Sequence, residues 1–358
     1  MSFCSNDYLG LADTPLGRAG VAVGAGASRL VAGEHVEHEE LEAALARWLD
    51  AEAALLFTSG YAANVGVVPA LAASPDDLVL SDALNHASLV DGCRLARGET
   101  RVFPHLDVDA VEAQLKRRGA PSRQSGRAWV VTESYFSMDA DSPDLGRLRR
   151  VCDELGAALI VDEAHAFGVL GPDGRGLLAS LGIHADVTVG TLGKAFGAAG
   201  AFVVGCQDLI DWLWNRARSF VFSTGLSPAL ARAGKDALGR LTGPGDDGPR
   251  GDAFGGDAFG ADTGPRVRVL ERAAQLRDGL RDLGHPPMGY GHIVPWLIGD
   301  SATAVRFAET LQAQGFDVQA IRPPSVPPGT ARIRFTASAR QSAADVDRLV
   351  SAVRELRR

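Results

Sequence analysis

The sequence lacks the features that mark membrane and secreted proteins. No stretch approaches the run of about 20 apolar residues that a membrane-spanning helix needs. Met1 leads directly into the polar run from Ser2 to Asp7, which offers no apolar signal core. We therefore expect a soluble, cytoplasmic protein without a membrane partner.

Paired cysteines and a basic surface are also missing. The chain contains no Cys-x-x-Cys pair, so it predicts neither a zinc site nor a disulfide framework, and its thiols are expected to be free and buried. The four cysteines are Cys4, Cys93, Cys152 and Cys206. The net charge is −8 and the pI is about 5.5, and nothing in the sequence supplies a basic stripe. A nucleic-acid partner is therefore not expected.

A large hydrophobic fraction is present: 46% of the 358 residues, enough to bury the core of one or two domains. Short apolar runs alternate with helical stretches. Because these runs are continuous rather than alternating, they predict a mostly parallel α/β sheet covered on both faces. The predicted strands are 78–80, 129–132, 158–161, 187–189 and 201–204, and the predicted helices include 39–56, 147–154 and 209–217.

The segment 242–266 differs from the rest of the chain. It is rich in Gly, Pro and Asp and repeats 251–255 almost unchanged at 256–260, which predicts a flexible surface insertion. The pattern beyond it predicts a smaller α+β domain. Its expected helices are 267–283, 302–314 and one at the C-terminus, and its expected strands are 293–298, 318–321 and 331–336. The predicted division is 1–38, 39–241, 242–266 and 267–358.

Lys194 is the strongest candidate for a catalytic residue. It follows the β-branched run 187–191 through a turn of small residues. Upstream, the apolar run 159–161 ends in Asp162 and then His165. Open α/β sheets bind ligands at the carboxyl ends of their strands. A desolvated lysine can attack a carbonyl, and an aspartate can keep a pyridinium nitrogen protonated, so the pattern predicts a pyridoxal phosphate site.

These residues also fit two other interpretations. Asp162-Glu163-Ala164-His165 is also typical of the metal-binding acid of a helicase or ATPase, but that function requires a phosphate loop ending in Gly-Lys-Ser/Thr. The Gly-Lys pairs end at Lys194 and Lys235 and are followed by Ala and Asp, so neither fits. A lone lysine after a strand can also be a solvated loop residue.

Two further segments carry weaker signals. The small-residue turn 58–64 leads into an apolar helical run, and N–H groups at such a helix start bind phosphate, although many such turns only connect elements. His86 follows a predicted strand and could stack on an aromatic ring, or it could simply be solvated.

The order of these motifs resembles the α-oxoamine synthase family of fold-type I pyridoxal phosphate enzymes. The resemblance runs almost end to end and implies a large, mostly parallel α/β/α domain with a smaller α+β C-terminal domain. It is carried by 5–10, 24–30, 58–64, 86–88, 133–139, 162–165, 191–194, 222–224 and 332–334.

The resemblance assigns a role to each residue around Lys194. Lys194 would carry pyridoxal 5'-phosphate as a Schiff base and later move the α-proton. Asp162 would pair with the pyridine nitrogen, His86 would stack on the ring, and His165 would hydrogen-bond its phenolic oxygen. Ser137 would contact the same edge as His165. No metal is implied.

The resemblance also implies how the phosphate is held. The backbone of Gly60 and Tyr61, with the Thr191 hydroxyl, would bind it within one subunit. Ser223 and Thr224 would reach the phosphate of the neighbouring subunit, which implies a homodimer with shared active sites.

A substrate carboxylate would be bound by Arg334, whose forked guanidinium suits that task, with Asn6 facing the same region. Arg332 lies two residues earlier. We expect only one of the two arginines to point into the cleft, and the family pattern selects Arg334.

Within the family, the stretch 320–334 is most similar to members that condense L-alanine with a pimeloyl thioester in biotin synthesis. Siblings that use glycine with an acetyl or succinyl thioester, or serine with a long acyl chain, would need the same catalytic residues. They remain alternatives, as does a non-catalytic relative. Family members usually carry a longer segment before Ser5, so we expect the short start to affect binding of the acyl donor.

Overall fold

The computed structural model describes residues 1–14, 20–119, 126–242 and 264–356, which form two compact units. The larger unit contains most of the chain up to residue 242. The smaller unit combines Met1–Asp13, Phe136–Asp141 and the described residues from 264 onward. The predicted insertion at 242–266 lies almost wholly outside the described residues.

The larger unit is built on a seven-stranded sheet in the order β1-β7-β6-β5-β4-β2-β3. Neighbouring strands from β6 to β3 in this order are parallel, and β7 is antiparallel to both of its neighbours. The predicted mostly parallel α/β sheet is therefore confirmed. The strands are β1 (Ala53–Phe57), β2 (Leu78–Asp82), β3 (Glu99–Phe103), β4 (Ala128–Glu133), β5 (Ala157–Asp162), β6 (Val187–Thr191) and β7 (Ala201–Gly205).

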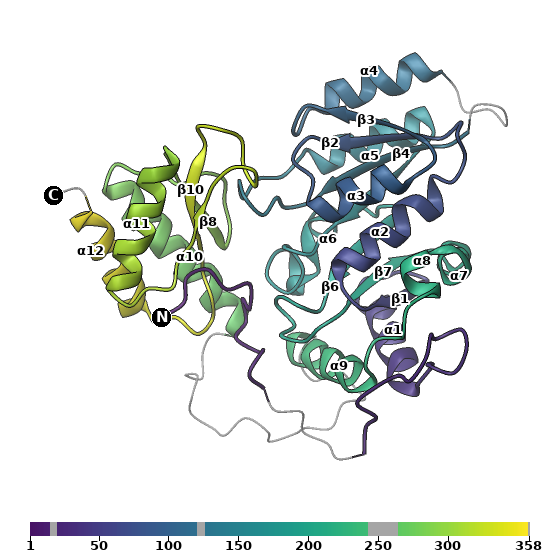
Figure 1. Ribbon diagram of the computed structural model, residues 1–358, viewed down its shortest axis with the longest axis horizontal. Coiled ribbons are helices and arrows are strands. Elements are labelled where there is room, and N and C mark those ends of the chain that lie inside the picture. Colours follow the sequence, from purple (N-terminus) through teal and green to yellow (C-terminus); the bar gives the residue numbers. More distant parts are fainter. Residues whose placement is uncertain (15–19, 120–125, 243–263, 357–358) are drawn as a thin grey trace. The chain divides into compact units, whose positions relative to one another are not determined.

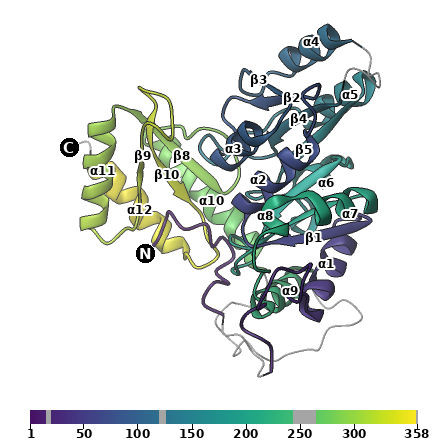
Figure 2. The same ribbon diagram turned by 45° about the vertical axis from the view of Figure 1, so that its right-hand side comes forward.

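Helices cover both faces of this sheet (Figure 1). One hydrophobic core packs α2 (Gly60–Leu71), α3 (Ala87–Leu95), α7 (Gln207–Arg216) and α8 (Arg218–Val221) on one face. The second core packs α4 (Val108–Arg118), α5 (Leu145–Leu155) and α6 (Gly176–Leu181) on the other. Helices α1 (Val36–Trp48) and α9 (Pro228–Thr242) lie beside each other (Figure 2). Because both faces are covered, the central strands are buried along their length, as their apolar runs predict.

Helix α5 shows how local sequence sets the boundaries of an element. Asp144 caps its start by accepting the N–H of Arg147 at 2.9 Å. Gly156 ends it in the left-handed conformation, with φ of 65°, which glycine adopts without strain. The chain then enters β5 directly, so Asp162 is delivered at the far end of a buried strand.

The predicted helix 39–56 was wrong at its C-terminal end. Helix α1 stops at Trp48, the chain turns through Asp50 with φ of 53°, and Ala53–Phe57 forms β1 against β7. Leu55, Leu56 and Phe57 are a short continuous apolar run, which periodicity alone does not assign to helix or strand. Strand β3 was not predicted, because most of Glu99–Phe103 is exposed and offers no apolar run.

The smaller unit contains a three-stranded antiparallel sheet, as the α+β prediction requires. Its order is β8 (Ile293–Gly299), β10 (Ala331–Thr336) and β9 (Ala320–Ile321). Helices α10 (Pro265–Asp282), α11 (Ser301–Ala313) and α12 (Ala343–Glu355) complete it. Strand β9 is shorter than the predicted 318–321.

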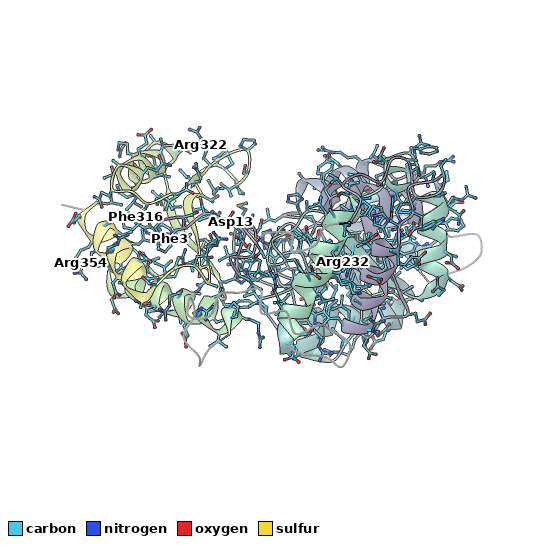
Figure 3. The ribbon with its side chains drawn as sticks, turned by 90° about the horizontal axis from the view of Figure 1, so that it is seen from below. Phe3, Asp13, Arg232, Phe316, Arg322 and Arg354 are labelled. Atoms are coloured by element: carbon cyan, nitrogen blue, oxygen red, sulfur yellow. The ribbon has the colours of Figure 1, made fainter. Side chains whose placement is uncertain are left out.

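The N-terminal residues belong to this smaller unit rather than to a separate segment 1–38. Ser2 bridges to Asp317, and Phe3 donates its N–H to the Asp317 carbonyl at 2.8 Å. The Phe3 ring is fully buried and meets Phe316 edge-on, with ring centroids 6.0 Å apart (Figure 3). Phe136–Asp141 likewise leaves the predicted domain 39–241. Both differences arise from tertiary contacts between segments distant in sequence.

No helix of the described ranges is long and apolar enough to cross a membrane.

Candidate active site

Polar side chains gather where the parallel strands of the larger unit end. Asp82 ends β2, Glu133 ends β4, Asp162 ends β5 and Thr191 ends β6. Glu133 and Asp162 are direct partners across the β4–β5 pair. Because the strands are parallel, their carboxyl ends share one edge of the sheet, the place where such folds bind ligands.

Asp162 is buried and held from two sides. One carboxylate oxygen accepts the N–H of Ala164 at 2.8 Å, and the other accepts the side-chain amide of Asn64 at 2.8 Å. A carboxylate has about four acceptor positions, so these two bonds leave capacity for a further donor such as a pyridinium N–H. The site therefore fits the pyridine nitrogen of pyridoxal phosphate.

Asn64 was not predicted to have a function of its own. It lies on α2, is 1% exposed, and also donates to the Ser88 hydroxyl at 2.9 Å. The available signal was a polar amide inside an otherwise apolar helical run, Gly60–Leu71.

His86 caps the start of α3 and lies close to this pair. The backbone N–H of His86 donates to a Glu133 carboxyl oxygen at 2.7 Å. The ring Nδ1 of His86 accepts the backbone N–H of Ser88 at 3.2 Å. Burial lowers the pKa of His86. The negative charge of Asp162 raises this pKa in part, and the positive charge of Lys194 lowers it. The ring is therefore neutral at neutral pH, which suits stacking on an aromatic cofactor.

Lys194 lies half-buried in the turn after β6. Two backbone bonds fix that turn: Gly197 donates to the Lys194 carbonyl at 3.0 Å, and Ala198 donates to the Leu192 carbonyl at 2.9 Å. The lysine's charge acts on the pKa of both His86 and Glu133, which places it in the same neighbourhood. His165 is also buried in the same unit.

Burial raises the pKa of Glu133 to about 8, and the nearby Asp162 charge adds to the rise while Lys194 opposes it. The ordinary value is 4.5, so between these values the folded protein binds a proton that the unfolded chain does not. The free energy of unfolding contributed by Glu133 therefore falls as pH rises through this window.

We expect Glu133→Gln to remove that dependence, because Gln does not titrate yet keeps an oxygen for the His86 N–H. In the cofactor-free protein, the melting temperature of the variant relative to the wild type should rise from about pH 5 to about pH 8. A difference that stays constant across this range would contradict the assignment.

A second set of groups can hold an anion. Ser59 caps α2 by accepting the N–H of Ala62 at 3.1 Å, and its carbonyl accepts that of Ala63 at 3.0 Å. The first N–H groups of a helix, here those of Gly60 and Tyr61, have no acceptor within the helix. A Cβ added at Gly60 would lie 3.9 Å from the Thr191 hydroxyl oxygen. The start of α2 and the Thr191 hydroxyl therefore lie close to each other. This arrangement fits a phosphate group.

Two details refine the predicted phosphate contacts. The Thr191 hydroxyl donates to the Gly200 carbonyl at 3.1 Å. To donate to a phosphate, the hydroxyl would have to give up this bond. The Tyr61 phenol points instead to Asp91, 2.5 Å away, so only the backbone of Tyr61 is available.

Ser223 and Thr224 follow α8 at the surface of the larger unit. The Ser223 hydroxyl donates to the Thr224 carbonyl at 3.3 Å, and Thr224 is exposed. Their contact with the phosphate of a neighbouring subunit stays a prediction.

The remaining predicted residues meet in the smaller unit. Arg334 on β10 donates to the Ser137 carbonyl at 2.5 Å and to the Asn6 side chain at 3.2 Å. Arg332 donates to the Asp139 carboxylate at 2.6 Å and to the Met138 carbonyl at 2.9 Å.

The expectation that only one of the two arginines could face this region was wrong. Residues two apart on a strand lie on the same face, and Arg332 and Arg334 both contact the segment 137–139. They differ in their partners, because Arg332 is neutralised by Asp139.

A cavity of about 960 Å³ lies elsewhere in the larger unit, with Trp129, Ala158 and Val187 from the amino-terminal parts of their strands in its lining. It is not the candidate site, because Lys194, Asp162 and His86 do not line it. Within the described residues, no group of three His, Cys, Asp or Glu side chains could hold a metal ion.

Comparison with known proteins agrees with this geometry. A model of the family described as aminotransferase class I and II matches residues 1–353. The chain is 44% identical over 360 residues to 8-amino-7-oxononanoate synthase of Geobacter sulfurreducens, covering 98% of this chain and 87% of that protein. Identity is also 44%, over 363 residues, with 8-amino-7-oxononanoate synthase of Anaeromyxobacter dehalogenans, covering 99% and 85%.

The fold has been seen in solved structures. A serine palmitoyltransferase variant from S. paucimobilis, with bound PLP and myriocin, matches with a TM-score of 0.87. The two sequences are 26% identical, and the match covers 99% of this chain and 87% of that one.

Proposed function

The chain belongs to the aminotransferase class I and II family and, within it, to the α-oxoamine synthases, and we propose that it is an 8-amino-7-oxononanoate synthase. The observation that carries this function is the 44% identity over nearly the whole chain with proteins of that name. The fold-type I transferase fold implied by the sequence motifs is confirmed. The reaction joins L-alanine to a pimeloyl thioester and yields 8-amino-7-oxononanoate, carbon dioxide and the free thiol carrier.

The cofactor is pyridoxal 5'-phosphate. When bound, it draws electron density away from the α-carbon of the amino acid that it carries. Lys194 would hold the cofactor, and its amine would take the proton from the α-carbon of alanine and return one to the product. The carboxylate of Asp162 would accept the N–H of the ring and keep that nitrogen protonated.

The other residues orient the cofactor and substrate. Neutral His86 would stack on the ring and His165 would donate to its phenolic oxygen, with Ser137 proposed as a second donor. The N–H groups of Gly60 and Tyr61 bind the phosphate, with the Thr191 hydroxyl as a third donor. Arg334 binds the alanine carboxylate in a charge-assisted pair, with Asn6 beside it.

A homodimer completes the proposed site through Ser223 and Thr224. Support comes from large apolar side chains exposed on the larger unit: Phe222 is 73% exposed, Val31 81% and Val23 82%. The loops that carry them are joined, because the Ser28 hydroxyl donates to the Val221 carbonyl at 2.9 Å. Such a cluster is typical of a surface that a second subunit covers. A cytoplasmic location stays a prediction.

The sibling reactions provide the sharpest test of substrate. Release of free thiol should be measured with alanine, glycine and serine, each against pimeloyl, acetyl, succinyl and palmitoyl thioesters. Alanine with the pimeloyl donor should give the highest kcat/KM, because the chain is 44% identical over nearly its whole length to 8-amino-7-oxononanoate synthases. Faster turnover of glycine with an acetyl donor, or of serine with a palmitoyl donor, would assign the chain to a sibling activity.

A further inference from the structure

Asn64 joins two residues of the site that are far apart in sequence. Its side-chain nitrogen lies 2.8 Å from Asp162 Oδ2 and 2.9 Å from Ser88 Oγ, so both N–H groups of the amide are donated. The amide cannot be turned over, because its oxygen would then lie against a carboxylate oxygen of Asp162, and two acceptors repel. The contacts therefore define the orientation of Asn64.

The chain of bonds continues from Ser88 to the imidazole. Ser88 Oγ lies 2.7 Å from His86 Nδ1, and the Ser88 N–H donates to the same nitrogen at 3.2 Å. Because Nδ1 accepts that N–H, it carries no proton, and the Ser88 hydroxyl must donate to it as well. The oxygen of Ser88 accepts from Asn64, so an unbroken run of hydrogen bonds leads from His86 through Ser88 and Asn64 to Asp162.

We propose that Asn64 is a positioning residue for the reaction, which fixes the Asp162 carboxylate toward the cofactor nitrogen and, through Ser88, holds His86 in its neutral form. This inference rests on the proposed function. Without Asn64, the second oxygen of Asp162 would lose its side-chain donor, and the carboxylate could rotate away from the ring. The Ser88 oxygen would be free to accept from a protonated Nδ1.

Packing alone does not explain an amide at this position. The Oδ1 atom of Asn64 is buried without a hydrogen-bond partner, which costs stability that an apolar residue of similar size would not lose. Neighbouring positions on α2, such as Ala63 and Val67, are apolar and fully buried. The two hydrogen bonds that the Asn64 amide donates, one of them to the charged Asp162, are therefore what stabilises an amide at this position.

The chain offers a matched control in Asn85. This second buried amide is 7% exposed and donates to Ser81 Oγ at 3.0 Å and to the Val131 carbonyl at 2.8 Å, without contacting Asp162. Asn85→Ala therefore removes an equivalent pair of buried bonds near His86. It should lower thermal stability about as much as Asn64→Ala does.

The test compares Asn64→Ala, Asn85→Ala and the wild type in two measurements. In the first, the cofactor-free proteins are titrated with pyridoxal 5'-phosphate and the pH dependence of the visible absorbance is recorded. Asn64→Ala should bind the cofactor about tenfold more weakly and shift the absorbance profile, because a bond to a charged group is lost. Asn85→Ala should match the wild type in both.

In the second measurement, the pKa of His86 is followed by NMR in the cofactor-free proteins, with His86→Ala identifying its signal among the eight histidines. The charged groups that act on His86 are Asp162 and Lys194, and Glu133 holds its N–H. The pKa of His86 should rise in Asn64→Ala, because both Ser88 and Asp162 then stabilise the imidazolium better. It should not change in Asn85→Ala.

Two results would overturn the inference. One is an Asn64→Ala protein with wild-type cofactor affinity, absorbance profile and His86 pKa. The other is an equal effect of Asn85→Ala, which would show that lost stability alone is responsible. Failure of the proposed function is a different outcome, since the wild type itself would then not bind the cofactor.

Discussion

Lys194→Ala should abolish turnover while leaving the fold intact. The substitution removes both the covalent anchor of the cofactor and the amine that moves the α-proton, and proton transfer by a positioned group contributes about 10²- to 10⁴-fold to rate. We expect kcat to fall by at least about a thousandfold. Backbone bonds fix the turn around Lys194, so the variant should keep its fold, which circular dichroism checks.

The controls are the other two lysines of the chain, Lys116 and Lys235. Each forms a salt bridge, to Glu112 and Glu40 respectively. Lys116→Ala and Lys235→Ala should keep wild-type kcat. In both variants, reduction with borohydride should still fix the cofactor to Lys194. A Lys194→Ala protein with substantial turnover would show that another group moves the proton.

Arg334→Ala should weaken alanine binding far more than Arg332→Ala does. The guanidinium of Arg334 donates to Ser137 and Asn6 and also hydrogen-bonds the Tyr8 phenol, and its five N–H groups still leave donors for a substrate carboxylate. Losing a desolvated charge-assisted pair should cost about 2–4 kcal/mol, or roughly 30- to 1000-fold in the apparent Kd for L-alanine. Cofactor affinity should hardly change.

Arg332 is the matched control because it lies on the same face of β10 but is neutralised by Asp139. Its loss should lower thermal stability, since the half-buried Asp139 carboxylate would lose its partner. Titration with L-alanine, followed by the cofactor's absorbance, separates the two. Equal and small effects would remove Arg334 from the site, and a large effect at Arg332 alone would exchange their roles.

The sequence predicted the centre of the larger sheet well because its strands carry unambiguous patterns. Strands β4 and β5 contain continuous apolar runs and β6 is rich in β-branched residues, so their existence could be read from the sequence, with ends one or two residues short of those observed. The polar residues at those ends, above all Asp162, were therefore assigned to one edge of the sheet. Strands β1 and β3 were missed because one follows a helix without a clear break and the other is an exposed edge.

Contacts between distant segments could not be predicted from local pattern. Phe3 and the segment 136–141 pack into the smaller unit although neither adjoins it in sequence. Asn64 is a similar case, because its function depends on Asp162 and Ser88, and only the folded chain brings these three together. The error at Arg332 and Arg334 was geometric and needed no structure, since residues two apart on a strand always share a face.

The most direct test of the proposed function is to follow the carboxyl carbon of alanine. The wild-type protein, loaded with pyridoxal 5'-phosphate, is given L-alanine labelled with ¹³C in its carboxyl group, together with a pimeloyl thioester. The account predicts labelled carbon dioxide, unlabelled 8-amino-7-oxononanoate and free thiol in equal amounts. Thiol release with the label retained in the amino-acid product, or no product from this pair of substrates, would contradict it.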